Sequence, residues 1–416
     1  MNYKKINFDN FELYYINTKK FKTINIDTLL INNYDKCDIN KEKVISEYLI
    51  NTSKECINEI DMSKKFMELY EPSIGIIDEF TDVHYKSFNI SFLNEKYTEK
   101  EMNKKTLDFY FNIIFEPNII NGSFDNKNLN LVKSKLITRS KLQKENSSFC
   151  AYYNSIKQIK DNVPSSIDTR LKESLIKMVD SKEACDYYLN EIKKSKVMVF
   201  VVGDIDDNFI KLIESNLKNR VYKNDYNWTK RYEVSKVKKE REIIIDTTFN
   251  QSILFMFYKI INITDRERQV VLPLFSNILG GSSSKLFNNV REKHSLAYYI
   301  HSSSSSIEPI FYIESGIESK NYKKTVELIK EQMNEMIIGN ITDTEIENNK
   351  ESLCSNLLNI DDNGHSIINQ LRSSIIGDLY YYEDMKEKYE SVSKEELINL
   401  GKKIELDFIC LSKGVN

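Results

Sequence analysis

The chain has 416 residues, of which 41% are hydrophobic and 29% are charged. This is an ordinary globular composition, and the length predicts two or three domains. The formal net charge of −3 is nearly balanced, which argues against a general binder of nucleic acid or of anionic membranes.

The sequence also lacks features of membrane, secreted and disulfide-rich proteins. No apolar run approaches the ~20 residues of a membrane-spanning helix, and the first residues, MNYKKINFDNFELYYINTKK, lack the features of a signal peptide. The six cysteines are scattered and form no C-x-x-C pair, so we expect reduced thiols rather than disulfides or a zinc knuckle. Together these features predict a soluble cytoplasmic protein.

The first half of the chain predicts a mixture of strands and helices. Period-two alternation predicts strands in the first forty residues, in FELYYI and INIDTLLI, and a strand pair over 73–93. Helices are expected after a cap at Asp38, over 98–117 where Pro117 ends the helix, over about 125–160, and over 168–193. A buried strand, a turn at Gly203 and a helix are expected over 195–217.

Residues 220–242 are polar, charged and weakly periodic, so they are the best candidate for a linker. The basic run within them is better explained as a solvated connector than as a nucleic-acid patch. Beyond the linker, we expect strands over 251–260, 297–307 and 310–317, a helix over 264–279, and helices over 319–338, 342–358, 364–378 and 383–403.

The order of elements therefore begins again after the linker. The closing strand LDFICLSKG (406–414) also echoes KVMVFVVGD (196–204) at the end of the first half. A repeat of about 200 residues is a duplicated domain rather than a solenoid. We expect an α+β fold with two homologous domains, 1–219 and 243–416, each a mostly antiparallel sheet with helices on one face.

The stretch LGGSSSKLFNNVREKHSLAYYIHSSSSS (279–306) stands out in a chain with only 11 glycines. Taken alone, Gly280 and Gly281 could be a helix C-cap, Arg291 a solvated arginine on an amphipathic helix, and Tyr298 a core residue at a strand start. The five serines lie between YYI and IFYI, which indicates a strand rather than a low-complexity linker.

This stretch resembles the C-terminal domain of the pitrilysin/insulinase-type metallopeptidases. That family has an L-G-G-x-x-S-x-L-F loop, then V-R-E-K-x-x-L-A-Y, then a Ser-rich strand, and VVGDID and the final SKG are similar too. The resemblance implies a clamshell chamber that encloses flexible peptides. It also implies that Arg291 and Tyr298 hold the substrate backbone and help to stabilise the oxyanion, while Gly280 and Gly281 let the backbone pass close to substrate.

Active members of the family carry an H-x-x-E-H zinc motif on the first helix and a further Glu on a later helix. No two of His84, His294, His301 and His365 are four residues apart, so this motif cannot be written anywhere. The matching residues are EKVIS (42–46), in which Glu42 and Ser46 cannot replace two imidazoles, and residues 126–144 contain no Asp or Glu. We expect no metal site and no catalytic residue in this chain, and structural or surface roles for its four histidines.

The combination of a missing zinc site and a retained Arg–Tyr pair favours one function. Within the family the likeness is nearest to a zinc-less bacterial type, which carries the label elongation-factor-P modification-associated and is encoded with a zinc-bearing sibling. This resemblance implies a non-catalytic subunit of a heterodimeric zinc peptidase. Its partner would hold the zinc, and the substrate would be a peptide or unfolded protein. The alternative is a peptide-binding or assembly scaffold without a role in proteolysis; an independent enzyme ranks third, since no Ser–His or Cys–His arrangement is evident.

Overall fold

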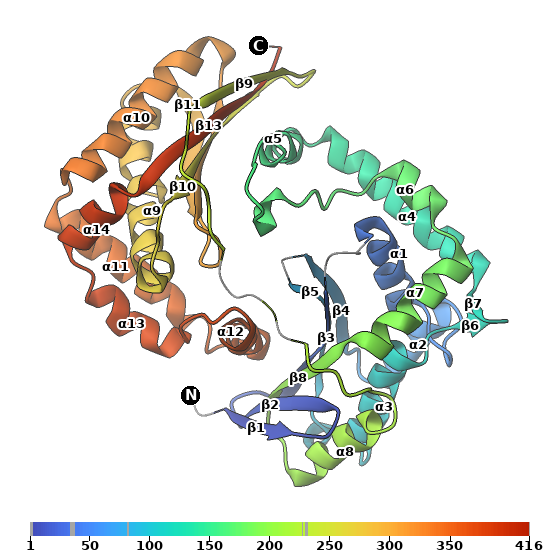
Figure 1. Ribbon diagram of the computed structural model, residues 1–416. Helices are drawn as coiled ribbons and strands as arrows, with labels where there is room; N and C mark the ends of the chain where they lie inside the picture. The colour runs from blue at the N-terminus through green and yellow to red at the C-terminus, as the bar shows by residue number, and fades with distance from the viewer. Residues whose placement is uncertain (1–2, 34–37, 81–82, 227, 229–231, 416) are drawn as a thin grey trace. The chain divides into compact units, whose positions relative to one another are not determined.

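The computed structural model describes residues 3–33, 38–80, 83–226, 228 and 232–415. The chain forms two compact units (Figure 1). The N-terminal unit comprises 1–142, 169–229 and 361–372, and the C-terminal unit comprises 143–168, 230–360 and 373–416. This division differs from domains of 1–219 and 243–416 at two segments, 143–168 and 361–372, each of which belongs with the opposite half of the chain.

The N-terminal unit is built on a six-stranded sheet in the order β1-β2-β8-β3-β5-β4. Its strands are β1 (Lys4–Asn7), β2 (Phe11–Asn17), β3 (Thr23–Asn33), β4 (Ser73–Phe80), β5 (Val83–Leu93) and β8 (Lys196–Gly203). β2 and β8 are parallel, and every other pair is antiparallel. The sheet is therefore mostly antiparallel, as predicted.

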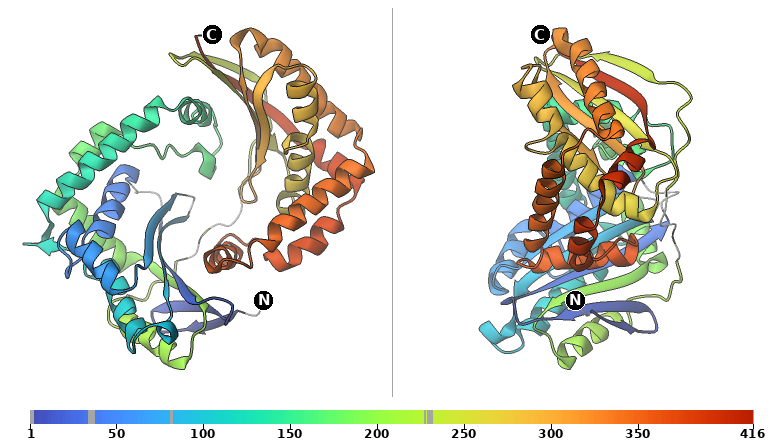
Figure 2. Two further views of the ribbon diagram at one scale, coloured as in Figure 1. Left: turned by 180° about the vertical axis from the view of Figure 1, so that it is seen from behind. Right: turned by 90° about the vertical axis from the view of Figure 1, so that its left-hand side faces the viewer.

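Helices cover one face of this sheet (Figures 1 and 2). They are α1 (Ile39–Asn51), α3 (Met102–Phe115), α4 (Asn126–Glu145), α7 (Ser181–Lys194) and α8 (Asp207–Leu217), and all five contribute buried apolar side chains to one core with the sheet. Two shorter helices, α2 (Glu59–Glu68) and α6 (Glu173–Met178), and a hairpin of β6 (Ile119–Ile120) and β7 (Ser123–Phe124) complete the layer. The predicted cap is present, because the Asp38 side chain accepts hydrogen bonds from two backbone N–H groups of the first turn of α1.

The C-terminal unit has a five-stranded sheet in the order β11-β12-β10-β13-β9. The strands are β9 (Arg241–Asp246), β10 (Ser252–Ile260), β11 (Ala297–Ser304), β12 (Ile310–Ile317) and β13 (Ile404–Lys413). β9 and β13 are parallel, and the other pairs are antiparallel. Read from β9, the order and directions repeat those of β2-β8-β3-β5-β4, so the two sheets share one topology. The predicted α+β fold with a duplicated domain is confirmed.

The helices of this unit are α9 (Leu272–Gly280), α10 (Tyr322–Ile338), α11 (Asp343–Leu358), α12 (Gly364–Ile376, whose first part belongs to the N-terminal unit), α13 (Tyr382–Glu390) and α14 (Lys394–Gly401). Two π-helical turns, η4 (Glu267–Val271) and η5 (Phe287–Glu292), precede α9 and β11. The helix expected over 383–403 is two helices, because a capping box of Ser393 and Glu396 starts α14. One strand, β9, was not expected from the sequence, and it begins inside the expected linker.

The second face of each sheet, opposite its main helical layer, is also packed against other parts of the chain. All nine residues of β10 are buried, so both faces of this strand lie against protein. On the face opposite α9, helix α5 (Ser147–Ile156) packs Ala151 and Ile156 into a cluster with apolar side chains of β10 and β13. In the N-terminal unit, Arg372 of α12 binds Asp27 of β3 at 2.5 Å. The prediction of helices on one face of each sheet therefore holds for the main layers only. A short segment from the other half of the chain covers the second face of each sheet.

None of the helices in the described part of the chain is both long and apolar enough to cross a membrane.

Candidate functional sites

The Gly280–Gly281 pair ends α9 where this helix meets β11. Gly280 is buried, and a Cβ atom on it would lie 2.4 Å from the backbone nitrogen of Ser302. The Gly281 N–H donates to the carbonyl of Asn277 at 2.9 Å and closes the helix. The Ser302 hydroxyl donates to the carbonyl of Ser276 at 2.7 Å, which ties the strand to the helix. Both glycines thus have a packing reason of their own: Gly280 lets β11 lie close to α9, and Gly281 ends the helix.

Arg291 and Tyr298 flank a tight turn between η5 and β11. The Arg291 side chain is 44% exposed, and its guanidinium lies over the Phe287 ring at 5.0 Å. Ser295 adopts a left-handed backbone conformation with φ of 51°, and its N–H donates to the carbonyl of Arg291 at 2.9 Å. The turn brings the two predicted residues into adjoining elements and leaves both side chains accessible.

Tyr298 lies in a β-bulge. Ala297 is opposite Ile317 and Tyr299 is opposite Gly316, so Tyr298 has no partner residue in the register. Bulges re-aim side chains and are frequent beside functional sites. Tyr298 is 58% exposed, which excludes the alternative of a core tyrosine.

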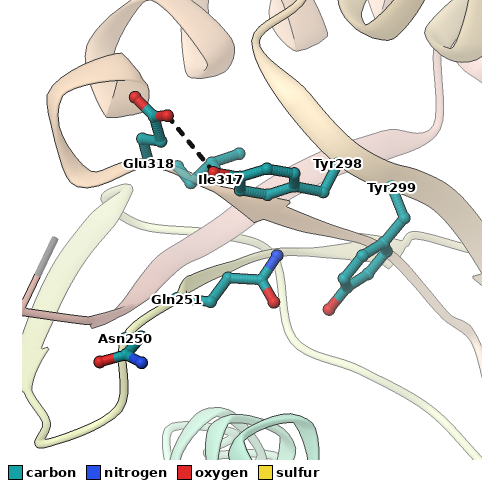
Figure 3. A pocket seen from close by; sticks show the side chains of 6 residues that line it. All are labelled: Asn250, Gln251, Tyr298, Tyr299, Ile317 and Glu318. Atoms are coloured by element: carbon teal, nitrogen blue, oxygen red, sulfur yellow. Dashed lines mark hydrogen bonds between the residues drawn. The ribbon is translucent and has the colours of Figure 1, made fainter.

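The Tyr298 side chain borders a cavity of about 420 Å³ (Figure 3). Its hydroxyl donates to the carboxylate of Glu318 at 3.3 Å, and the Tyr299 hydroxyl donates to Glu314 at 2.7 Å. Burial, with this hydrogen bond, raises the pKa of Tyr299, so its hydroxyl remains a donor at neutral pH. The cavity is lined by Asn250, Gln251, Tyr298, Tyr299, Ile317 and Glu318. Amide, phenol and carboxylate groups of this kind can bind the main chain of a peptide.

The serine run forms the second half of β11 and the turn that follows. Ser303 to Ser306 line a pocket of about 360 Å³ together with Ser165, Glu308 and the side chains of Ile307, Ile310 and Tyr312. The carboxylate of Glu308 accepts hydrogen bonds from the backbone and the hydroxyl of Ser165 at 2.9 and 2.8 Å. Ser302 to Ser304 lie in a strand, as predicted, but the strand ends there, and Ser305 and Ser306 lie in the turn that follows.

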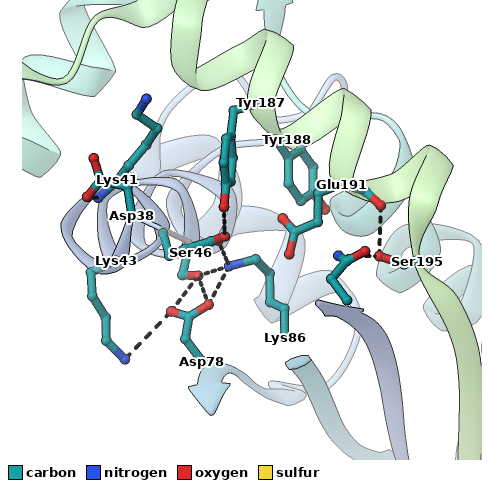
Figure 4. Close-up of polar contacts among 12 residues, drawn as sticks. Asp38, Lys41, Lys43, Ser46, Asp78, Lys86, Tyr187, Tyr188, Glu191 and Ser195 are labelled. Atoms are coloured by element: carbon teal, nitrogen blue, oxygen red, sulfur yellow. Dashed lines mark hydrogen bonds and ion pairs between the residues drawn. The ribbon is translucent and has the colours of Figure 1, made fainter. Parts of the chain in front are cut away.

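A second cluster lies on α1, where the family motif would place zinc ligands. Glu42 and Ser46 are one helical turn apart and both are buried. Between them lies the ammonium group of Lys86, from β5, which pairs with Glu42 Oε2 at 2.8 Å and donates to Ser46 Oγ at 2.8 Å (Figure 4). Lys86 also contacts Asp78 of β4, and Tyr187 of α7 donates to Glu42 at 2.6 Å.

The centre of this cluster, Glu42, Asp78 and Lys86, is buried, whereas the Lys43 side chain that reaches Asp78 at 3.6 Å is 31% exposed. Burial lowers the pKa of Lys86, but the carboxylates of Asp78 and Glu42 outweigh it, so the pKa lies well above its ordinary value. Burial raises the pKa of Asp78, but Lys86 and Lys43 outweigh it and the net pKa is lowered. Burial, with the neighbouring Glu42, raises the pKa of Glu191 well above its ordinary value. The ion pairs of the cluster join two carboxylates, Glu42 and Asp78, to two ammonium groups, Lys86 and Lys43.

The residues of this cluster do not fit zinc. Zinc requires deprotonated or neutral ligands at about 2.0–2.3 Å, whereas the donor set here surrounds a protonated lysine. The buried residues of α4 are Leu129, Val132, Leu136 and Ser140, none of which is a zinc ligand. The protein's own ammonium group would repel a metal ion placed at this point.

Sequence reasoning missed Lys86 and Asp78, and it assigned His84 only a local role. A signal was available in β5, VHYKSFNISFL (83–93). Alternate residues of a strand share a face, and Phe88, Ile90 and Phe92 are buried in the core. His84 and Lys86 continue the same series, so the pattern places a lysine on a core-facing row. Of the other histidines, His294 and His301 are exposed, as expected.

The structure thus combines a duplicated α+β fold with an edge-strand cavity in one unit and an ion-pair cluster in the other. Residues 179–353 match the family model of the peptidase M16 inactive domain. The chain is 25% identical over 406 residues to the "Probable inactive metalloprotease YmfF" of Bacillus subtilis (strain 168), covering 96% of this chain and 95% of that protein. It is 30% identical over 178 residues to the "Uncharacterized zinc protease YmxG" of the same strain, covering 42% of this chain and 41% of that protein.

Solved structures share the fold. A conserved protein from Enterococcus faecalis V583 superposes with a TM-score of 0.91 at 22% identity, covering 100% of this chain and 99% of that one. The peptidase M16 inactive domain from Pseudomonas fluorescens gives a TM-score of 0.82 at 15% identity, with coverage of 100% and 99%. By these matches the chain is similar to the peptidase M16 family, the pitrilysin/insulinase-type metallopeptidases, and over most of its length to a protein that is named as an inactive member.

Proposed function

We propose that this chain is the non-catalytic subunit of a heterodimeric zinc peptidase that acts on peptides or unfolded protein. Arg291 and Tyr298 would bind the substrate main chain close to the zinc of the partner subunit. The observation that carries the proposal is Tyr298, which a bulge at the edge of a sheet presents, exposed, beside a cavity whose lining includes amide and carboxylate side chains.

The position of β11 supports the binding of an extended peptide. β11 is an edge strand of its sheet, and edge strands can accept a further strand through main-chain hydrogen bonds. Gly280 takes part by letting β11 lie close to α9, and Gly281 by ending α9. A peptide lying along this edge would pass Tyr298 and Glu318, whose side chains already meet.

The relatives support a division of labour between two chains. One strain of Bacillus subtilis contains both a relative named as an inactive metalloprotease and a relative named as a zinc protease. A chain with a retained Arg–Tyr pair and a lysine at the zinc position suits the first role. The described cysteines form no disulfide with one another, which suits the cytoplasmic location that we propose for the complex.

The test is cleavage of a fluorogenic peptide by the purified chain, by a zinc-bearing sibling from the same organism, and by their mixture. We expect activity in the mixture well above that of either chain. Arg291→Ala and Tyr298→Phe should each lower the turnover of the mixture by roughly 10²–10³, the typical loss of one oxyanion-stabilising group. Lys293→Ala is the matched control, because Lys293 is an exposed cation of the same turn.

Two outcomes would count against the proposal. Unchanged turnover with Arg291→Ala, while the two chains still associate, removes the role assigned to this residue. A mixture no more active than the sibling alone, with bound peptide detected on this chain, would favour the alternative of a peptide-binding scaffold.

A further inference from the structure

Three side chains around Lys86 lie close enough together to hold a metal ion if the ammonium group were absent. Glu42, Asp78 and His84 each offer one ligand atom, and these atoms lie within 4.8 Å of one another. They come from α1, β4 and β5, so three elements of the N-terminal unit converge on one point. Two carboxylates and an imidazole are a common ligand set for divalent cations.

His84 strengthens this interpretation. The residue is 2% exposed, and its Nε2 atom has no hydrogen-bond partner among the described residues. Its ring stacks on Phe80 at 5.1 Å, which fixes its orientation. A buried polar atom without a partner is costly, and a bound cation would remove that cost.

The ammonium of Lys86 already fills the centre of the cluster. A lysine ammonium has three N–H donors, and here Glu42, Asp78 and Ser46 supply three acceptors. By the family resemblance, Glu42 and Ser46 match the two positions, one helical turn apart, at which active members place imidazoles. The same turn of α1 therefore holds a cation, but that cation is covalently part of the chain.

We propose that Lys86 replaces the metal ion in this unit, and that it closes a latent divalent-cation site formed by Glu42, Asp78 and His84. The lysine supplies one positive charge at the centre, and Lys43, 3.6 Å from Asp78, supplies the second. The polar core is thereby kept neutral without zinc. The inference concerns the N-terminal unit alone and stands or falls independently of the proposed heterodimer.

Removal of the ammonium should open the site. Lys86→Ala vacates the space and leaves the two carboxylates and His84. The chain, full length and purified with chelator, would be titrated with zinc against a chromophoric competitor, and the melting temperature would be measured with and without zinc. We expect Lys86→Ala to bind about one zinc ion per chain with a higher melting temperature, because a ligand that binds only the folded state stabilises it.

Two variants serve as controls. Lys86→Ala/His84→Ala lacks the imidazole and should bind zinc at least about tenfold more weakly than Lys86→Ala, because coordination number and ligand type set the affinity. Lys43→Ala removes the peripheral cation but keeps Lys86, so it should bind no more zinc than the wild type.

The remaining outcomes are decisive. Binding by the wild type as tight as that of Lys86→Ala would overturn the proposal, as would a folded Lys86→Ala that binds none. If Lys86→Ala is unfolded without metal, refolding is measured by circular dichroism with added zinc. Recovery of the native spectrum supports the latent site, and failure to refold at saturating zinc refutes it.

Discussion

Replacement of Lys86 by methionine should destabilise the N-terminal unit by about 3–5 kcal/mol, the usual cost of removing one partner of a buried ion pair. Lys86 is 0% exposed and lies 2.8 Å from Glu42. Coulomb's law at an effective dielectric constant of about 20 gives an attraction of about 6 kcal/mol at that distance, part of which offsets the desolvation of the lysine. Methionine keeps most of the volume, so the loss reports charge rather than a cavity.

A second substitution tests whether the loss of stability comes from the uncompensated charge. Lys86→Met leaves Glu42 and Asp78 facing Lys43 alone, with one negative charge in excess. Glu42→Gln in the same chain restores neutrality and keeps an oxygen that can accept from Tyr187. The double variant should therefore be more stable than Lys86→Met by about 1 kcal/mol or more, within the usual range of coupling between contacting residues.

The single tryptophan of the chain makes the assay selective. Trp228 belongs to the N-terminal unit, and Lys196 of β8 lies over its ring at 5.5 Å. Urea unfolding followed by tryptophan fluorescence should thus report this unit. With a slope of about 2 kcal/mol per M, Lys86→Met should lower the midpoint by about 2 M. Lys104→Met is the control, because its ion pair with Asp108 is exposed, and its midpoint should stay unchanged.

The reasoning would be refuted if Lys86→Met cost less than about 1 kcal/mol, or if the double variant were no more stable than the single one. Either result would mean that the carboxylates do not depend on the ammonium.

Three other changes test the packing of the two units. Gly280→Ala forces a methyl group against the backbone of Ser302 and should cost about 1–3 kcal/mol, seen as faster amide hydrogen exchange in β11. Arg372→Met leaves a buried carboxylate on β3 and should cost about 3–5 kcal/mol, read by tryptophan fluorescence. Burial raises the pKa of Asp161, but hydrogen bonds from Lys259 and its other neighbours outweigh it, so the net pKa is lowered. The stabilisation is then present above the unfolded pKa of about 4 and is lost as the pH falls; Asp161→Asn should be less stable than wild type at pH 7, and the gap in melting temperature should close toward pH 3.

The sequence predicted the architecture well because the alternation of apolar residues is local. The pair β4 and β5, the cap at Asp38 and the strand β8 follow from patterns a few residues long. β9 was missed because it lies in a charged segment and alternates only weakly. Its place in the sheet comes from parallel pairing with β13, more than 150 residues later, which no local pattern reveals.

In the candidate sites, too, only features that depend on neighbouring residues could be predicted from the sequence. Arg291 and Tyr298 could be singled out from a motif, although the bulge that presents Tyr298 depends on its register with β12. The cluster around Lys86 could not be assembled from sequence, because its members lie on α1, β4 and β5. A charged residue on a core-facing row of β5 was the one visible sign of it. The segments that change units could not be foreseen either, since their partners are distant in sequence.

Residues 143–168 belong to the C-terminal unit and residues 361–372 to the N-terminal unit, and this arrangement has a consequence for folding during biosynthesis. Neither sheet can be completed before its last strand has been synthesised. β8 lies between β2 and β3, and β13 lies between β10 and β9. Beyond that, the N-terminal unit lacks Arg372 and the rest of its final segment until the ribosome has made nearly nine-tenths of the chain. Contacts so distant in sequence fold slowly. Cleavage in the linker would separate the N-terminal unit from its segment 361–372 and the C-terminal unit from its segment 143–168. The two units therefore depend on each other's half of the chain for folding, although their sheets are separate.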